Sequence, residues 1–228
     1  IHTKIITIAN QKGGCGKTTI TMQLAGSLGK DGLKILVVDA DPQGTATRWV
    51  ASASDDLPFP AHIAGLSAAG GQVHKEVKKY IGLYDYILID CPPSLNMLTV
   101  NALVAAHGVI IPMQCEYYAL EGLTALLDTI EQIRSTLNFD LTVEGLLRTM
   151  FDPRNNLAND VSAQLLEHFG DKVYRTMVPR NVRLAEAPSH GLPAMAYDRR
   201  SQGALAYLAL AGEMIRKEAG SRLAEASV

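Results

Sequence analysis

Residues 10–19 read Asn-Gln-Lys-Gly-Gly-Cys-Gly-Lys-Thr-Thr, and this segment indicates the fold of the chain around it. An apolar run, residues 5–9, leads into it, and a helix-forming run, residues 18–30, follows. Strand, glycine-rich turn and helix in this order are typical of a phosphate-binding P-loop. Glycines let the backbone curl so that successive N–H groups point at phosphate oxygens. The dipole of the following helix adds positive potential at the same place.

This loop offers both backbone and side-chain ligands to a nucleotide. We expect the ammonium group of Lys17 to reach the β- and γ-phosphates and the hydroxyl of Thr18 to bind Mg²⁺. The residues of the loop predicted to bind the nucleotide are Lys12, Gly13, Gly14, Cys15, Gly16, Lys17, Thr18 and Thr19. The alternative is a glycine turn without a ligand, but it does not explain why strand, glycines, Lys-Thr pair and helix coincide.

One position departs from the usual P-loop pattern, because Gln11 stands where the first glycine is expected. A second lysine, Lys12, lies five residues before Lys17. The resulting K-G-G-x-G-K-T-T segment resembles the deviant P-loop of the ParA/MinD ATPase family. In that family the early lysine reaches across a nucleotide-sandwich dimer to the partner's phosphates. The resemblance therefore implies an ATP-dependent homodimer with Lys12 acting in trans, and ATP, ADP and Mg²⁺ as ligands.

Two further apolar runs end in aspartates. Residues 34–39 end at Asp39 and are followed closely by Asp41, and residues 84–90 end at Asp90. The carboxyl ends of parallel strands line the crevice where α/β proteins bind ligands. Asp90 therefore has the position of a Walker B residue and is expected to act on Mg²⁺ through a water.

The segment that starts at Asp39 resembles switch I of the same family. There the second aspartate helps to hold Mg²⁺ and positions the attacking water, which implies this role for Asp41. Either aspartate could instead cap the next helix, and this alternative is stronger for Asp39.

Strand and helix patterns alternate along the whole chain without a linker or repeat. We predict further strands at 108–113, 141–150 and 173–178, and helices at 73–81, 95–106, 156–169 and 201–218, with another helix ending near 137. Residues 45–71 have weak signals and are interpreted as a connector in which Trp49 packs. The chain is thus expected to form one doubly wound α/β domain over residues 1–228, with a mostly parallel sheet and a frayed tail at 219–228.

Composition limits the classes of function. The chain has 228 residues, 47% of them hydrophobic, with a formal net charge of −2, and no run approaches a membrane span or a signal peptide. Cys15, Cys91 and Cys115 form neither a disulfide framework nor a C-x-x-C pair, which suits a reducing cytoplasm, and no iron–sulfur cluster is expected. Residues 172–217 hold eight basic and three acidic residues. Such an excess can contact a polyanion, but many α/β enzymes carry one without using it.

The resemblance extends beyond the loop to the chromosomal ParA/Soj proteins. The similar segments are residues 39–47, 84–94, 112–124, 149–157 and 179–191. In Soj-type proteins two loop arginines support non-specific DNA binding by the ATP-bound dimer, and the matching positions are Arg154 and Arg183. The resemblance also places Pro179 and Asn181 beside the adenine ring. For each arginine, the alternative is an ion pair or a dimer contact.

This resemblance implies an ATPase that converts ATP and water to ADP and phosphate, slowly when alone, with Lys12, Lys17 and Asp41 as catalytic residues. A ParB-like protein or a cargo adaptor would stimulate hydrolysis and release the protein from double-stranded DNA of the nucleoid, in the cytoplasm, to segregate a chromosome or plasmid.

Residues 49–79 form a shorter region than in typical chromosomal members. An alternative function therefore stays open, in which the ATPase positions a protein cargo such as a carboxysome or chemotaxis cluster. A MinD-like membrane regulator is disfavoured, since residues 216–228 include only two bulky apolar side chains. A metabolic P-loop enzyme is disfavoured by Lys12 and the two arginine loops.

Overall fold

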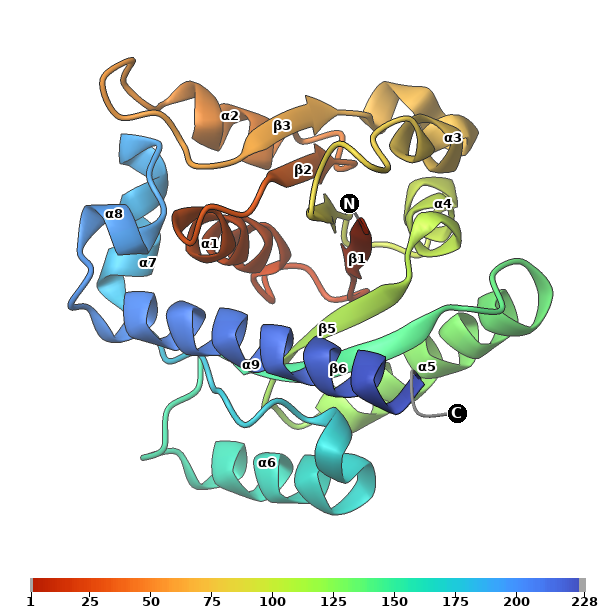
Figure 1. Cartoon of the computed structure of the whole chain (residues 1–228). Helices are drawn as coiled ribbons and strands as arrows, with labels where there is room; N and C mark the ends of the chain where they lie inside the picture. The colour runs from red at the N-terminus through yellow and green to blue at the C-terminus, as the bar shows by residue number, and fades with distance from the viewer. Residues whose placement is uncertain (1, 226–228) are drawn as a thin grey trace.

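The structure is a computed structural model that describes residues 2–225, and these form one six-stranded sheet of order β3-β2-β4-β1-β5-β6 (Figure 1). The strands are β1 (Lys4–Ile8), β2 (Ile35–Asp39), β3 (His62–Gly65), β4 (Tyr86–Asp90), β5 (Gly108–Gln114) and β6 (Thr142–Thr149). Every pairing between these strands is parallel. The predicted doubly wound α/β fold is confirmed, and the sheet is parallel throughout the described part of the chain.

Helices cover both faces of the sheet. They are α1 (Lys17–Lys30), α2 (Thr45–Ala51), α3 (Val73–Lys78), α4 (Met97–Ala105), α5 (Ala119–Thr136), α6 (Asn156–Phe169), α7 (Val182–Glu186), α8 (Ala194–Tyr197) and α9 (Gln202–Glu225), with short 3₁₀ helices η1 (Ser67–Gln72), η2 (Gly170–Lys172) and η3 (Ala187–His190). Helices α1 and α9 pack side by side on one face, while α4 and α5 lie on the other (Figure 1).

Two apolar clusters fill the space between sheet and helices. Ile5 and Ile87 belong to the cluster beneath α4 and α5, whereas Ile6 and Leu88, their neighbours in sequence, belong to the cluster beneath α1 and α9. Successive strand residues point to opposite faces, so a strand buried on both sides needs a continuous apolar run. The same arrangement brings the carboxyl ends of β1, β2 and β4 together at one edge of the sheet.

Three segments differ from the sequence-based predictions: the edge strand β3, residues 173–178 and the end of α9. The edge strand β3, which pairs with β2, lies in the region interpreted as a connector. It is only four residues long, which is too short for a clear alternation of apolar and polar residues.

Residues 173–178 are not a continuous strand. Isolated bridges occur at Val173 and Pro179, and the N–H groups of Tyr174 and Val178 donate to carbonyls of β6 at 2.9 Å. The strand is not continuous because the backbone N–H groups of Arg175 and Thr176 donate to the carboxylate of Glu213 in α9, at 2.8 and 3.0 Å. A side chain thus takes the place of a strand partner.

Helix α9 also continues to Glu225, past its expected end at residue 218 and into the tail predicted to fray. Glu218 explains this continuation, because its carboxylate accepts a hydrogen bond from the Tyr86 hydroxyl of β4 and pairs with Arg222 one turn further on. Residues 226–228 lie outside the described residues. Trp49 is buried, as expected of a packing residue, and its indole N–H donates to the carbonyl of Leu192 at 3.1 Å.

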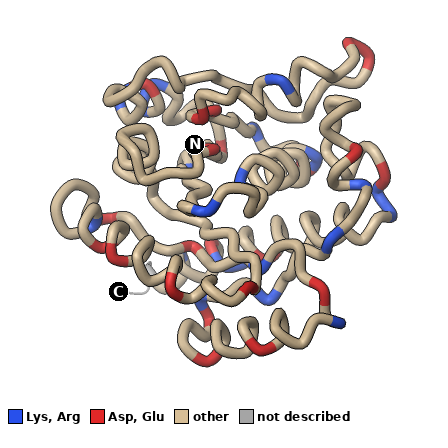
Figure 2. Tube along the Cα trace, turned by 180° about the vertical axis from the view of Figure 1, so that it is seen from behind, with Lys and Arg blue, Asp and Glu red and all other residues tan. Residues whose placement is uncertain are grey.

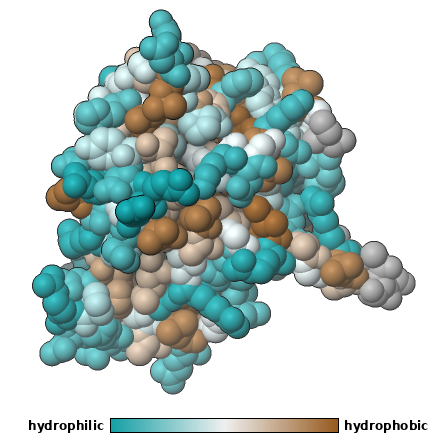
Figure 3. All heavy atoms as spheres, turned by 60° about the vertical axis from the view of Figure 1, so that its left-hand side comes forward, coloured by the Kyte–Doolittle hydropathy of each residue, from teal (hydrophilic) through white to brown (hydrophobic). Residues whose placement is uncertain are grey.

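The helices and the exposed apolar residues bear on contact with a membrane or a partner. Within residues 2–225, each helix is too short or too polar to cross a bilayer. On the side of the molecule that carries α7 and α8, hydrophobic residues lie in small groups between hydrophilic ones (Figure 3). Scattered exposed apolar residues of this kind are usual on a folded protein.

Candidate functional site

The glycine-rich loop connects the end of β1 to the start of α1. Gly14 and Gly16 have φ angles of 72° and 87°, which residues with a Cβ rarely adopt. Gly16 is the N-cap of α1 and, having no side chain, caps none of its N–H groups, and no acidic residue lies in the first turn. The first N–H groups of a helix have no partner within the helix. The end of α1 therefore offers uncapped donors and a positive dipole to an anion.

Side chains from the neighbouring strands hold this loop in place. Asn10 accepts a hydrogen bond from the N–H of Lys12 at 3.0 Å and donates to the carbonyl of Pro112 in β5 at 2.6 Å. Gln114, at the end of β5, donates to the carbonyl of Gly14 at 3.3 Å. The hydroxyl of Thr149, at the end of β6, donates to the carbonyl of Cys15 at 3.2 Å. The three contacts from β5 and β6 were not predicted.

The two lysines of the loop have different surroundings. Lys17 is only 7% exposed, and its ammonium group donates to the carbonyl of Lys12 at 2.9 Å. Lys12 is half exposed, and its ammonium group forms an ion pair with Glu116, in the segment between β5 and α5. Lys17 is thus held inside its own loop, whereas Lys12 lies at the surface.

Three aspartates meet at the ends of β2 and β4. Asp39 and Asp90 are register partners on adjacent strands, and Asp41 follows two residues after Asp39. The hydroxyl of Thr18 donates to Asp90 at 2.7 Å. Burial raises the pKa of Asp90 to about 7; the Thr18 hydrogen bond opposes this shift, and the charges of Asp39 and Asp41 add to it. Asp39 accepts from both the N–H and the hydroxyl of Thr47, at 2.9 and 2.7 Å, and so caps α2.

The donor set at this place fits Mg²⁺. Oδ1 of Asp90 is buried and has no hydrogen-bond partner among the described residues, while its Oδ2 bonds Thr18. Carboxylate and hydroxyl oxygens suit this hard cation, which is usually held by one or two protein oxygens together with water and substrate phosphates. Residues 2–225 contain no group of three or more His, Cys, Asp or Glu side chains arranged as a metal cage. The residues that would hold Mg²⁺ are Thr18 and Asp90, with Asp41 nearby.

A cavity of about 540 Å³ opens beside the loop. It brings together parts of the P-loop and α1, the end of β6, and the segment before α7, with Gly16, Thr19, Met150, Pro179 and Asn181 among its lining residues. The Asn181 side chain accepts from the N–H of Arg183 at 3.1 Å and thereby caps α7. Met150, which was not predicted, lines the cavity with a φ of 48°, a left-handed conformation that is uncommon for a residue with a side chain.

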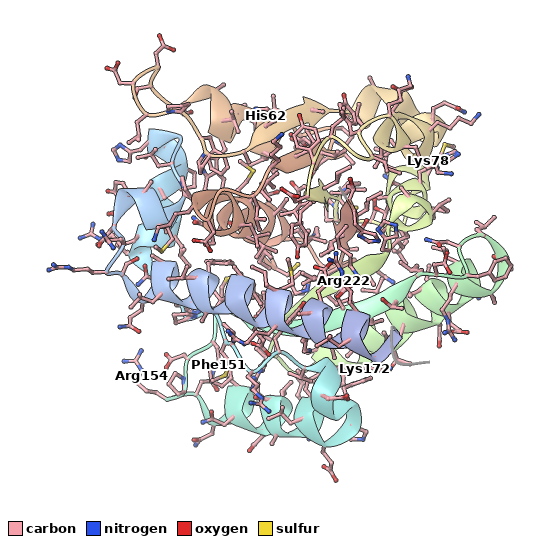
Figure 4. All side chains as sticks on the ribbon, viewed as in Figure 1. His62, Lys78, Phe151, Arg154, Lys172 and Arg222 are labelled. Atoms are coloured by element: carbon pink, nitrogen blue, oxygen red, sulfur yellow. The ribbon has the colours of Figure 1, made fainter. Side chains whose placement is uncertain are left out.

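The two arginines predicted to contact DNA lie on separate segments, Arg154 on a loop and Arg183 in the first turn of the short helix α7 rather than on the expected loop. Arg154 precedes α6 and projects from the edge of the molecule with its side chain 89% exposed (Figure 4). Arg183 is 46% exposed in α7. Arg154 pairs with the carboxylate of Asp152 at 2.8 Å, and Arg183 pairs with two carboxylates, those of Glu186 at 2.7 Å and Asp198 at 3.2 Å. Seen from behind, basic and acidic residues are interspersed along the trace rather than separated onto faces of one sign (Figure 2).

Comparison with known proteins identifies the family. Residues 6–194 match the CobQ/CobB/MinD/ParA nucleotide binding domain. The chain is 45% identical to the sporulation initiation inhibitor protein Soj of Bacillus subtilis, over 92% of this chain and 98% of Soj. It is 41% identical to the chromosome partitioning protein ParA of Caulobacter vibrioides, over 94% of this chain and 95% of ParA.

A solved structure has the same fold. Cobyrinic acid a,c-diamide synthase from Mycobacterium smegmatis, with bound ADP and magnesium, superposes with a TM-score of 0.75 at 30% identity and covers 94% of each chain. Two kinds of observation support one family assignment. The structure has a glycine loop between parallel strands with an aspartate–threonine pair beside it, and the relatives match the chain over nearly their whole length. The chain belongs to the CobQ/CobB/MinD/ParA nucleotide-binding family and, within it, to the ParA/Soj group of chromosome-partitioning ATPases.

Proposed function

We propose that this protein hydrolyses ATP, dimerises around ATP, binds DNA without sequence preference and leaves it after hydrolysis, and so segregates chromosomal or plasmid DNA. The observation that carries the proposal is the pairing of Thr18 with Asp90, whose second oxygen has no partner among the described residues, at the mouth of the glycine loop. The names of the relatives at 41% and 45% identity favour DNA over a small metabolite as the object of this chemistry.

The glycine loop and the residues around it would position the triphosphate. The uncapped N–H groups at the start of α1 and the backbone of residues 13–19 bind phosphate oxygens, and Lys17 places a positive charge among them. Pro179 and Asn181 line the cavity into which the adenine base fits. Mg²⁺ held by Thr18 and Asp90 supplies charge neutralisation on the phosphates. Asp41 orients the attacking water, because it lies next to this cluster and is less buried than Asp39 and Asp90.

The position of Lys12 supports the proposed dimerisation. Its ammonium group lies at the surface, half exposed, next to the loop that binds phosphate. A positive charge at this place is available to a nucleotide on a second copy of the chain. Two nucleotides between two protomers make the dimer depend on ATP, and each Lys12 contributes to hydrolysis on the partner. A ParB-like protein or a cargo adaptor accelerates this step.

Non-specific DNA binding is assigned to Arg154 and Arg183. Both are flexible cations near loops, and such side chains neutralise phosphates without contact to base edges. Arg154 first has to exchange one carboxylate partner for a phosphate, and Arg183 has to exchange two. Exposed ion pairs are weak enough for this exchange. A dimer presents each arginine twice, so binding through two weak sites becomes dependent on nucleotide through avidity. The protein would then associate with the nucleoid in its ATP-bound form.

The test compares DNA retention of the wild type and of an Arg154→Gln/Arg183→Gln variant with ATP and Mg²⁺, over a range of salt concentrations. Each lost phosphate contact makes the negative slope of log affinity against log salt less steep by about 0.9, so the loss of two arginines from each protomer of a dimer makes it less steep by about 3.6. Arg134→Gln removes another exposed, ion-paired arginine and is the matched control. An unchanged slope in the double variant, with ATP-dependent dimerisation intact, would exclude these arginines as the DNA contacts.

A further inference from the structure

The ion pair between Lys12 and Glu116 joins two segments that are 104 residues apart in sequence. Lys12 lies in the glycine loop, and Glu116 lies between β5 and α5. Both side chains are half exposed, at 50% and 51%, so water and a second molecule have access to the pair. An exposed ion pair contributes little to the stability of a fold, and stability alone is a weak reason for this one.

The backbone around the pair is rigidly anchored on both sides. The N–H of Lys12 bonds the side chain of Asn10, which in turn bonds β5 through the carbonyl of Pro112. Gln114 bonds the loop through the carbonyl of Gly14, and its own carbonyl accepts from the N–H of Glu116 at 2.9 Å. The two charged side chains therefore start from fixed points beside a cavity of about 370 Å³ that both of them line.

Lys12 and Lys17 differ in a way that bears on the dimer. Lys17 is almost fully buried and donates to a backbone carbonyl of its own loop. Lys12 has an anionic partner that it can exchange, because an ammonium group on a long flexible stem can turn from one acceptor to another. A triphosphate carries more negative charge than one carboxylate. A phosphate on a second protomer would thus be the stronger acceptor for this ammonium group.

We propose that Glu116 is a positioning residue that holds Lys12 on its own protomer and competes with the partner's phosphates for it. This proposal rests on the proposed nucleotide-dependent dimer and concerns how that dimer is regulated. Each protomer has to release one Lys12–Glu116 pair when the dimer forms. Glu116 would therefore raise the protein concentration at which ATP produces dimers and keep Lys12 away from other anions until two loaded protomers meet.

The test is the variant Glu116→Gln, which keeps the size of the side chain and removes its charge. Dimerisation with ATP and Mg²⁺ is measured by light scattering or sedimentation over a range of protein concentrations. One exposed ion pair contributes a factor of about 1.4 to 5 to an equilibrium, so the loss of two pairs should lower the dimer dissociation constant about 2- to 30-fold. The ratio of wild-type to variant constants should fall toward one between about 0.05 M and about 0.5 M salt, because salt screens the exposed pair.

The control is Glu131→Gln, which removes one negative charge from an exposed ion pair near the other end of α5. It should leave the dimer constant unchanged. Equal or weaker dimerisation of Glu116→Gln would overturn the competition and show that Glu116 supports the dimer or has no part in it. If the wild type itself forms no dimer with ATP, the proposed function fails instead, so the two failures are distinguishable.

Discussion

The carboxylate of Glu213 holds the segment between β6 and α7, and its removal tests whether that segment is as tightly bound as the structure indicates. Glu213 is 9% exposed in α9 and accepts three hydrogen bonds, from the N–H of Arg175 at 2.8 Å, the N–H of Thr176 at 3.0 Å and the Thr176 hydroxyl at 2.8 Å. The segment ends at Pro179, which lines the proposed adenine cavity. Removal of the Glu213 carboxylate should therefore reduce both the stability of the fold and its affinity for the nucleotide.

The perturbation is Glu213→Gln. Glutamine has a single acceptor oxygen, so at least one of the two backbone N–H groups loses its partner, and the remaining hydrogen bonds lose their charge assistance. An N–H group left without a partner costs about 1–3 kcal/mol, and we expect the free energy of unfolding at pH 7 to fall by this amount. Urea unfolding, followed by circular dichroism, measures the change.

The pH dependence has a definite sign. Burial alone would raise the pKa of Glu213, but the three hydrogen bonds hold the pKa below its ordinary value of 4.5. A carboxyl group with a lowered pKa in the folded state contributes stability that is fully present above its unfolded pKa and is lost as pH falls through the folded pKa. The difference between wild type and variant should thus be constant from pH 7 to about pH 5 and shrink below about pH 4.5.

Glu167→Gln is the matched control, since Glu167 is an exposed residue of α6. It should change the unfolding free energy by no more than about 0.5 kcal/mol. A Glu213→Gln variant as stable as the wild type at pH 7, or equally destabilised at pH 7 and pH 3, would refute the account of the 173–179 segment.

Three further predictions concern the loops and the site. Gly191→Ala should destabilise the fold more than Gly32→Ala, because both glycines have positive φ but only at Gly191 would a new Cβ lie 2.0 Å from a backbone atom, the nitrogen of Ala53. In urea unfolding, Gly32→Ala is expected to cost about 1–2 kcal/mol and Gly191→Ala about 1–3 kcal/mol more; equal losses would contradict the close approach. Lys17→Ala should abolish ATP binding in calorimetry, while Lys12→Ala should bind ATP but dimerise poorly; unimpaired dimerisation would remove Lys12 from the interface. Asp41→Ala should bind ATP, stay dimeric on DNA and release no phosphate, and normal phosphate release would exclude its proposed role.

Much of the architecture was predictable because it depends on short-range patterns. Continuous apolar runs such as residues 35–39 and 86–90 predict strands buried on both faces, and both strands are observed. The strand–loop–helix order around residues 10–19 predicts where phosphate binds. The edge strand β3 escaped prediction because its four residues pair on one side only, with β2, and are not deeply buried.

Other features could not be predicted, because they join residues far apart in sequence. Residues 173–178 have the composition of a strand, yet Glu213 accepts hydrogen bonds from the N–H groups of residues 175 and 176, and Arg148 donates to the carbonyl of Tyr174 at 2.8 Å. No local pattern indicates that a glutamate in the last helix will do this. In the same way, the support of the glycine loop by Gln114 and Thr149 depends on β5 and β6 lying next to β1 in that order.

The amino-acid sequence alone determined the fold class, the family resemblance and the identity of the loop, because strand and helix periodicity and glycine spacing are local properties of the chain. Only the tertiary structure decided which acceptor each lysine of the loop has and which oxygen of Asp90 has no partner among the described residues. It also decided that the side chain of Glu213 replaces a strand partner for residues 175 and 176. Such contacts depend on the order of the strands and on the packing of α9 and α5, and these emerge when separate apolar faces are buried together.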